Sequence, residues 1–307
     1  MSEYITAYEY ESNVNPVLKS VPITTKHPSE CNYGINFIDF SDIYNVKHKA
    51  SSPNLLASFI KLQSYSEYSV SNNIKNNYVN GSSHLFYIIS GQCQIILNHD
   101  DIESGLEIFN VSCEDIFVCP CFESICIKNN GSDELNIYYI NDSPLLNYLG
   151  SNSTKRTFKP SLYSKEFIYE NLINLSNPNN NRKGILLSNK DTEEIGVNTI
   201  TPVLWSLYNE LPPNRRQLPH KHNSVALDLC VKCDDSENIY TLIGDSLDSD
   251  GNIINPIKVH WKTSEMFITP PSLWHSHHND GDTYAYILPI QDAGILLYQR
   301  ILGIVFN

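Results

Sequence analysis

Six of the ten histidines lie between His220 and His278, and their spacing is that of a metal site. His220 and His222 are two residues apart, so in a β-strand both side chains project from one face while Lys221 projects from the other. A third imidazole from another strand would complete a three-nitrogen site. The best candidate is His275, which follows an apolar run ended by two prolines. Neutral imidazole suits Fe, Zn, Cu and Ni, and three ligands leave positions open for a substrate or O2.

The pair of histidines alone is a weak signal, because two exposed histidines on a polar strand have the same spacing. The Trp-His-Ser-His-His cluster at 274–278 strengthens the interpretation as a metal site. A polar pocket that binds no metal is the alternative.

Composition limits the classes of protein to which this chain can belong. Its 307 residues, 41% hydrophobic and 18% charged, indicate a globular protein of one large or two ordinary domains. A net charge of −13 argues against nucleic acid or an anionic membrane as the main partner. A small-molecule substrate is expected instead. No basic segment followed by an apolar one opens the sequence, so we expect a cytoplasmic protein with reduced cysteines.

Short strands separated by turns must position these histidines, and the same plan occurs twice. In each half a pair of strands is followed by an acidic turn, an apolar strand, a proline and another strand. The acidic turns are at 113–115 and 263–265, and the prolines are Pro120 and Pro270. Two β-rich runs flank Ser90-Gly91, which predicts a hairpin there. We therefore expect two homologous β-barrels.

The halves suggest a division of the chain into three parts. Residues 1–150 would form an irregular N-terminal arm, up to about residue 45, and a barrel without metal. Residues 151–196 would connect the barrels and hold a short helix, and residues 197–307 would form the metal-binding barrel. The first half has no His-x-His pair and no histidine after Pro120. His84 is therefore interpreted as a structural residue of a strand.

These patterns resemble those of the bicupins, which carry two jelly-roll β-barrels in one chain, and predict an all-β fold with a few short helices. Within that group the chain resembles the gentisate and salicylate 1,2-dioxygenase family. Residues 218–227, Leu-Pro-His-Lys-His-Asn-Ser-Val-Ala-Leu, are similar to the family's P-x-H-R-H-x-x-x-A-L/F. Residues 267–279 are similar to its L-T-P-P-x-x-W-H-D-H-G-N. The similarity covers about residues 200–295, and the first half shares only the barrel plan.

The resemblance implies that His220, His222 and His275 ligate Fe(II), with Zn, Mn or Ni as alternative metals and O2 as co-substrate. His277 would sit beside the metal as a catalytic residue that bonds substrate or bound dioxygen. Trp205, fifteen residues before His220, sits where the family has a pocket tryptophan.

The expected function is that of a non-haem Fe(II)-dependent dioxygenase acting on a small metabolite, in a homo-oligomer (dimer or tetramer). A non-oxidative metal-dependent isomerase or lyase, and a metabolite-binding bicupin without turnover, are the alternatives, since a fold alone does not fix the chemistry.

Three departures from the family pattern concern the substrate. Asp228 stands where the ring-cleaving members have an arginine that binds the substrate carboxylate. Pro289 replaces the first aspartate of the family's L-D-G-L-D segment, while Asp292 keeps the second. The metal-binding barrel is the C-terminal one here and the N-terminal one in the family. We expect Trp205, Asp228 and Asp292 to contact the substrate.

The orientation of Asp228 depends on the strand that holds it. An unbroken strand from His220 would place Asp228 on the inward face, because the spacing is even, and a bulge would turn it outward. An inward carboxylate would repel a salicylate-like anion unless another cation replaced the arginine. Arg215 and Arg216 are candidates for that cation, although arginines in a turn are more often solvated.

Overall fold

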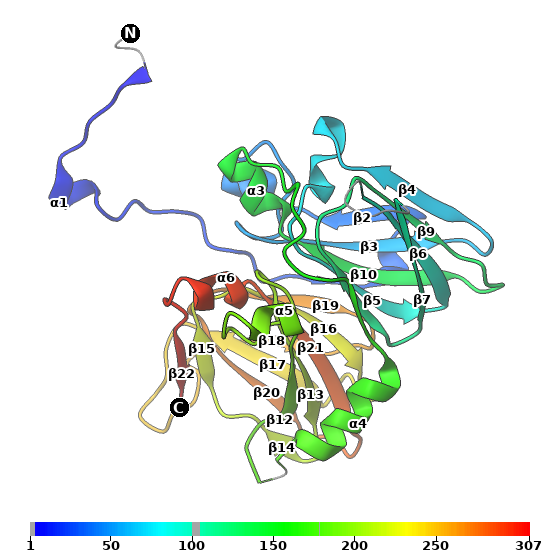
Figure 1. Ribbon diagram of the computed structural model, residues 1–307. Helices are drawn as coiled ribbons and strands as arrows, with labels where there is room; N and C mark the ends of the chain where they lie inside the picture. The colour runs from blue at the N-terminus through cyan, green and yellow to red at the C-terminus, as the bar shows by residue number, and fades with distance from the viewer. Residues whose placement is uncertain (1–3, 100–104, 178) are drawn as a thin grey trace.

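The computed structural model describes residues 4–99, 105–177 and 179–307 and consists mainly of β-strands arranged in two barrels (Figure 1). Within these ranges the strands form four sheets, accompanied by short α-helices. The predicted all-β bicupin fold is confirmed. The helices are α1 (Tyr10–Asn13), α2 (Ser41–Tyr44), α3 (Ser143–Leu149), α4 (Lys165–Leu175), α5 (Lys190–Glu193) and α6 (Ala293–Tyr298).

The first barrel packs a six-stranded sheet, in the order β11-β8-β5-β10-β3-β2, against a four-stranded sheet, β4-β9-β6-β7. Apolar side chains of both sheets fill the space between them. The strands are β2 (Gly34–Ile38), β3 (Leu56–Leu62), β4 (Glu67–Ser71), β5 (His84–Ser90), β6 (Gln92–Asn98), β7 (Leu106–Ser112), β8 (Ile116–Cys119), β9 (Ser124–Lys128), β10 (Leu135–Asn141) and β11 (Ser161–Tyr163).

The second barrel pairs the sheet β1-β19-β16-β21-β13-β12 with the sheet β18-β17-β20-β15-β22, and β14 pairs with β20. Its strands are β1 (Thr25–Lys26), β12 (Lys183–Leu187), β13 (Trp205–Leu211), β14 (Arg215–Arg216), β15 (His220–His222), β16 (Ala226–Lys232), β17 (Ile239–Gly244), β18 (Ile257–His260), β19 (Met266–Thr269), β20 (Trp274–Asn279), β21 (Ala285–Gln291) and β22 (Ile304–Phe306).

The two barrels share one plan, as the repeated pattern predicts. In each barrel a central strand, β5 or β16, lies between the strand that follows the acidic turn and the strand that closes the barrel. The acidic turns even share a backbone detail. Glu114 (φ 71°) and Ser264 (φ 70°) occupy equivalent positions before β8 and β19, both in the left-handed region that non-glycine residues seldom adopt.

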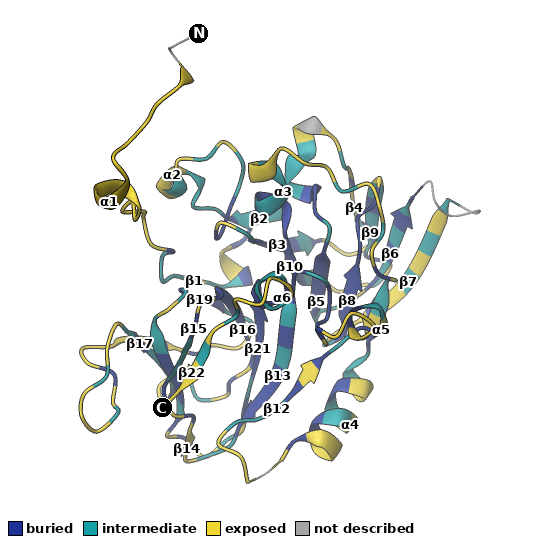
Figure 2. Ribbon diagram, turned by 60° about the vertical axis from the view of Figure 1, so that its left-hand side comes forward, coloured by how far each residue is buried: buried dark blue, intermediate teal, exposed yellow. Residues whose placement is uncertain are grey.

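The six-stranded sheets of the two barrels contribute to a common hydrophobic core. Leu227 and Leu229 on β16 belong to the same buried cluster as Tyr138 and Ile140 on β10, and Figure 2 shows both strands as buried. Since side chains alternate along a strand, Asp228, between Leu227 and Leu229, faces the interior of the second barrel instead. This alternation positions one wall of the candidate site.

The hairpin predicted at Ser90-Gly91 is wrong. β5 pairs with β8 and β10, and β6 pairs with β7 and β9, so the chain passes from one sheet to the other at this point. Gly91 has a φ of 84°, which suits so sharp a change of direction. Residues 84–97 do form two strands with a turn at Gly91, as the sequence predicts, but a turn does not reveal whether the strands on either side of it pair.

Segments expected to be irregular also supply strands. Within residues 1–45, β1 pairs with β19 of the second barrel and β2 pairs with β3 of the first. Within residues 151–196, β11 extends the first barrel and β12 pairs with β13 of the second. The division of the chain at residues 150 and 197 stays a prediction. No helix of the described ranges is long and apolar enough to cross a membrane.

Candidate metal centre and substrate cavity

The three histidines proposed as ligands lie together on two neighbouring strands. His220 and His222 are on β15, and His275 is on β20, where it pairs directly with His220. One ring nitrogen of each lies within 4.8 Å of those of the other two, and the described part of the chain has no other such group of histidine, cysteine or acidic residues. The ring centres of His220 and His275 are 4.0 Å apart, and those of His222 and His275 are 4.8 Å apart.

Hydrogen bonds fix two of these rings in the form that binds a metal. The Nδ1 of His222 donates to the Ser224 carbonyl at 2.9 Å, and the Nδ1 of His275 donates to the Leu273 carbonyl at 3.1 Å. A carbonyl only accepts, so Nε2 of each neutral ring keeps its lone pair.

The chemistry of the donor set fits a divalent metal. His222 Nε2 and His220 Nδ1 are buried and have no hydrogen-bond partner among the described atoms. Burial lowers the pKa of His222 and His275, and lowers that of His220 to about 2, so the rings are neutral at physiological pH. Unpartnered buried ring nitrogens are costly unless a ligand satisfies them, and neutral imidazole is the form that binds Fe(II) or Zn(II).

His277, on β20, lies beside this group and not in it. Its ring centre is 5.9 Å from that of His275. Its Nδ1 is 2.8 Å from Thr241 Oγ1, which accepts a hydrogen bond from Trp261 Nε1, also at 2.8 Å. Among the described residues, the Thr241 hydroxyl therefore donates its proton to His277 Nδ1. Because Nδ1 accepts, the proton of the neutral ring is on Nε2. Burial lowers the pKa of His277 to about 3, so the ring is a neutral N–H donor.

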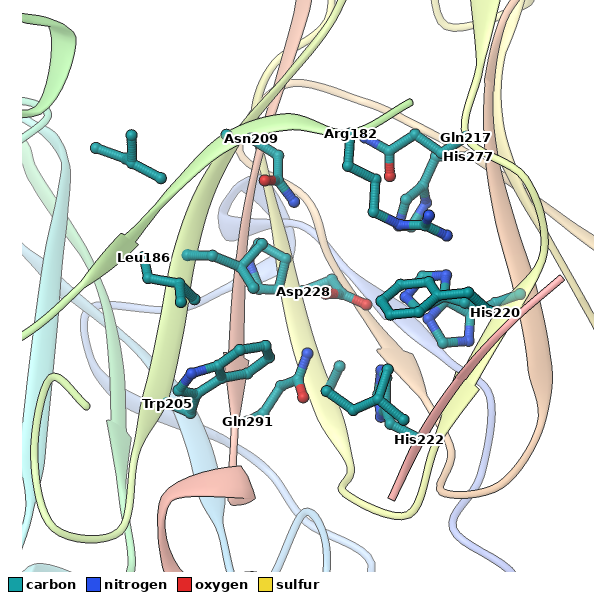
Figure 3. A pocket seen from close by; sticks show the side chains of 18 residues that line it. Arg182, Leu186, Trp205, Asn209, Gln217, His220, His222, Asp228, His277 and Gln291 are labelled. Carbon is teal, nitrogen blue, oxygen red and sulfur yellow. The ribbon is translucent and has the colours of Figure 1, made fainter. Parts of the chain in front are cut away.

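The histidines line a cavity of about 190 Å³ inside the second barrel (Figure 3). Trp205, expected at the substrate, lies on the wall of this cavity with Leu186 and Pro289 as apolar neighbours. The amide side chains of Asn209, Gln217 and Gln291 supply polar groups around it. A small cavity with apolar walls and a few convergent polar groups is typical of a binding site for a small metabolite.

Asp228 faces this cavity, although the unbroken strand that would have placed it there does not exist. β15 ends at His222 and β16 begins at Ala226, in a different sheet. The inward orientation comes from the alternation within β16. Asp228 is fully buried, and Thr269 Oγ1 donates to its Oδ2 at 2.7 Å. Burial raises the pKa of this carboxyl group to about 7.

Arg182 is the functional candidate that the sequence did not suggest. It precedes β12 and reaches the cavity, where its guanidinium lies 4.7 Å from the ring centre of Phe306 and its Nη2 donates to the Leu218 carbonyl. Its Nε is buried without a hydrogen-bond partner in the described structure. Burial lowers its pKa to about 10, which still leaves it a cation at neutral pH. Arg215 and Arg216 are exposed on β14 and are not among the residues that line the cavity.

Asp292, expected at the substrate, lies instead at the start of α6, outside the cavity lining. Its Oδ1 accepts from the Val225 N–H at 2.9 Å, and its Oδ2 accepts from Asn54 Nδ2 of the first barrel at 2.7 Å. Asp142 has the equivalent place before α3 and accepts from the Ser82 and Ser83 N–H groups. The repetition indicates that this aspartate fastens a corner of each barrel.

His84 has a partner for each ring nitrogen. Its Nδ1 lies 2.8 Å from the Tyr139 hydroxyl and its Nε2 lies 3.2 Å from the Gly81 carbonyl. Both contacts support its interpretation as a structural residue. That the first barrel binds no metal stays a prediction.

Comparison with known structures supports the bicupin fold of this chain. No family model matches the sequence, and no curated protein is significantly similar to it. In fold the chain is similar to salicylate 1,2-dioxygenase from Pseudaminobacter salicylatoxidans, with a TM-score of 0.62 and 12% identity over 83% of this chain and 76% of that chain. A structure of that enzyme with gentisate gives a TM-score of 0.68 and 11% identity over 96% and 87% of the two chains. An oxalate decarboxylase structure gives 0.53 and 11% over 91% and 78%. The resemblance to the gentisate and salicylate dioxygenase bicupins is thus confirmed for the fold.

Proposed function

We propose that this protein is a non-haem Fe(II)-dependent dioxygenase of the gentisate 1,2-dioxygenase-like cupin type, acting on a small metabolite. The observation that carries the proposal is the group of His220, His222 and His275 in a cavity that also holds a guanidinium, with a buried, unpartnered ring nitrogen on His220 and another on His222. The sequence resemblance favours Fe(II) over Zn, Mn or Ni. When bound, Fe(II) would supply the redox chemistry through which O2 oxidises an oxygen-bearing substrate.

The side chains around the centre would bind and orient that substrate. Arg182 offers charged N–H groups to an anionic oxygen group, and Trp205 offers a flat apolar surface to a ring. His277, held by Thr241 with its proton on Nε2, would donate a hydrogen bond to an oxygen that gains negative charge during the reaction. The burial of these groups keeps water away and strengthens each electrostatic interaction. Assembly as a dimer or tetramer is part of this proposal.

Oxygen consumption tests the proposal directly. Metal-free protein would be loaded anaerobically with one equivalent of Fe(II) and mixed with O2 and a panel of hydroxybenzoates and catechols, each with and without an aminomethyl group. We expect substrate-dependent O2 uptake that His275→Ala abolishes and that the matched change in the first barrel, His84→Ala, leaves in place. Stoichiometric Fe(II) binding without O2 uptake for any panel member would argue against a dioxygenase of this type.

One observation favours a second candidate, a non-oxidative isomerase or lyase. Asp228 is a buried carboxyl group in the cavity with a pKa raised to about 7, which suits a general base. The fold similarity to oxalate decarboxylase is compatible with such chemistry. Turnover by Zn(II)- or Mn(II)-loaded protein in the absence of O2 would identify this class, and binding without any turnover would identify a metabolite-binding protein.

A further inference from the structure

A guanidinium and a carboxyl group line the cavity without pairing with each other. Arg182 and Asp228 both belong to its wall, yet no ion pair joins them among the described residues, and neither is paired with any other charged side chain there. We propose that they bind the two ends of a dipolar substrate: a carboxylic acid, held by Arg182, that also carries an aliphatic ammonium group, held by Asp228. This inference rests on the proposed function for the identity of the site and adds the substrate class.

Asp228 has few hydrogen-bond donors around it. Its one protein donor is Thr269 Oγ1, which bonds Oδ2, and Oδ1 has no donor among the described residues. Phe267 and Pro289 are its neighbours on the two adjacent strands, and a proline has no N–H to offer. A carboxylate that is fully buried is costly unless a cation and further donors accompany it. The fold thus supplies a buried carboxylate that can bind a cation.

A substrate ammonium group suits this carboxylate better than a hydroxyl group does. An ammonium has three donors and a positive charge, so it can bond Oδ1 and offset the buried charge at once. A hydroxyl group supplies a donor but no charge. A plain aromatic acid supplies neither and leaves the carboxyl group unpaired.

Arg182 is held in place and still has a donor to offer to a substrate. Its Nη2 donates to a carbonyl and its guanidinium packs on Phe306, so the side chain is held in place. Its buried Nε still lacks a partner among the described atoms, which leaves a charge-assisted donor for an anionic oxygen. The cavity therefore distinguishes an acid with an ammonium group from one without it, and Asp228 is the residue that makes the difference.

The test measures binding, not turnover. Zn(II)-loaded protein would be titrated by calorimetry with matched pairs of acids that differ in one group. One arm compares 2-hydroxybenzoates carrying an aminomethyl group at each open ring position with ethyl-substituted compounds of the same shape. A second arm compares L-serine with 3-hydroxypropionate, and so separates an aliphatic from an aromatic framework. The variants are Asp228→Asn, which keeps the shape, and Arg182→Met, which keeps the length.

We expect at least one ammonium compound to bind about tenfold more tightly than its partner, since a buried charge pair contributes at least that much. Asp228→Asn should remove this preference, and Arg182→Met should weaken both members of the pair. Equal or weaker binding of every ammonium compound by the natural protein would overturn the proposal even if no variant folded. So would a preference that persists in Asp228→Asn. Because Zn(II)-loaded protein consumes no O2, this result is independent of the oxygen-uptake test of the proposed function.

Discussion

Replacing Asp228 with asparagine should stabilise the second barrel by an amount that grows from about pH 4 and is largest above about pH 7. Asparagine keeps the shape of the side chain and an oxygen that accepts from Thr269, but it cannot ionise. Burial raises the pKa of Asp228 from its ordinary value of 3.8 to about 7. Between these values the folded protein holds a proton that the unfolded chain releases, so the free energy of unfolding falls as the pH rises from about 4 to about 7.

The size of this effect follows from the pKa. At 1.36 kcal/mol for each pH unit, ionising Asp228 in the folded protein costs about 4 kcal/mol at pH 8. The Asp228→Asn protein avoids this cost. The difference in the free energy of unfolding between the Asp228→Asn protein and the natural protein should be near zero at pH 4. It should grow between pH 4 and pH 7 and level off above pH 7. Asp292, whose pKa burial also raises, to about 6, contributes equally to both proteins and cancels from the difference.

Tryptophan fluorescence is the assay that suits this chain. Its three tryptophans, Trp205, Trp261 and Trp274, all lie in the second barrel, so urea unfolding followed by fluorescence reports on that barrel. The experiment uses metal-free protein at pH 5, 6, 7 and 8, with Asp250→Asn in an exposed loop as the control.

Two results would refute the reasoning: a stability difference that does not change with pH, or a natural protein that is the more stable at pH 8. Adding Zn(II) should shrink the difference, because a nearby dication favours the carboxylate.

Three further changes test other parts of the site. His222→Ala should abolish tight binding of one divalent metal, measured by elemental analysis, whereas His84→Ala should retain it; equal metal content in both would contradict the assignment. Thr241→Val should keep the metal but lower kcat about 10- to 100-fold, as is typical of residues that orient a functional histidine, and Thr241→Ser should restore it. An unchanged kcat would show that Thr241 does not set the proton position of His277. Asp292→Ala should lower the free energy of unfolding by about 2 kcal/mol, because it leaves a buried N–H unpaired; a change in substrate preference without loss of stability would place Asp292 at the substrate instead.

The grouping of the three histidines was predictable because its signal is local. His220 and His222 face the same way because they lie two residues apart on one strand. His275 joins them because it lies on the neighbouring strand of the same sheet. The repeated acidic turn and proline likewise revealed two barrels without any knowledge of how their strands pair.

Features that depend on pairing between distant segments were not predictable in this way. Arg182 lies in a polar, asparagine-rich stretch of the sequence. It reaches the cavity because Lys183–Leu187 pairs with β13, and no local pattern in the sequence predicts that pairing. The orientation of Asp228 stayed open in the sequence, because it depends on a change of sheet between His222 and Ala226. The hairpin at Gly91 failed for the same cause: a turn between two strands does not show in which sheet each strand will lie.

The pairing of β1 with β19 has a consequence for the order in which the chain can fold during synthesis. Lys26 lies opposite Met266, so these partners are separated by 240 positions in the sequence. The segment that forms β1 leaves the ribosome well before β19, so about 240 further residues must be synthesised before its partner strand exists. Until then β1 has no partner strand in the sheet. The strands of the first barrel, β2 to β11, end at Tyr163, so that barrel can form early, whereas the second barrel, which holds the three histidines proposed as ligands, needs both β1 and the strands up to β22.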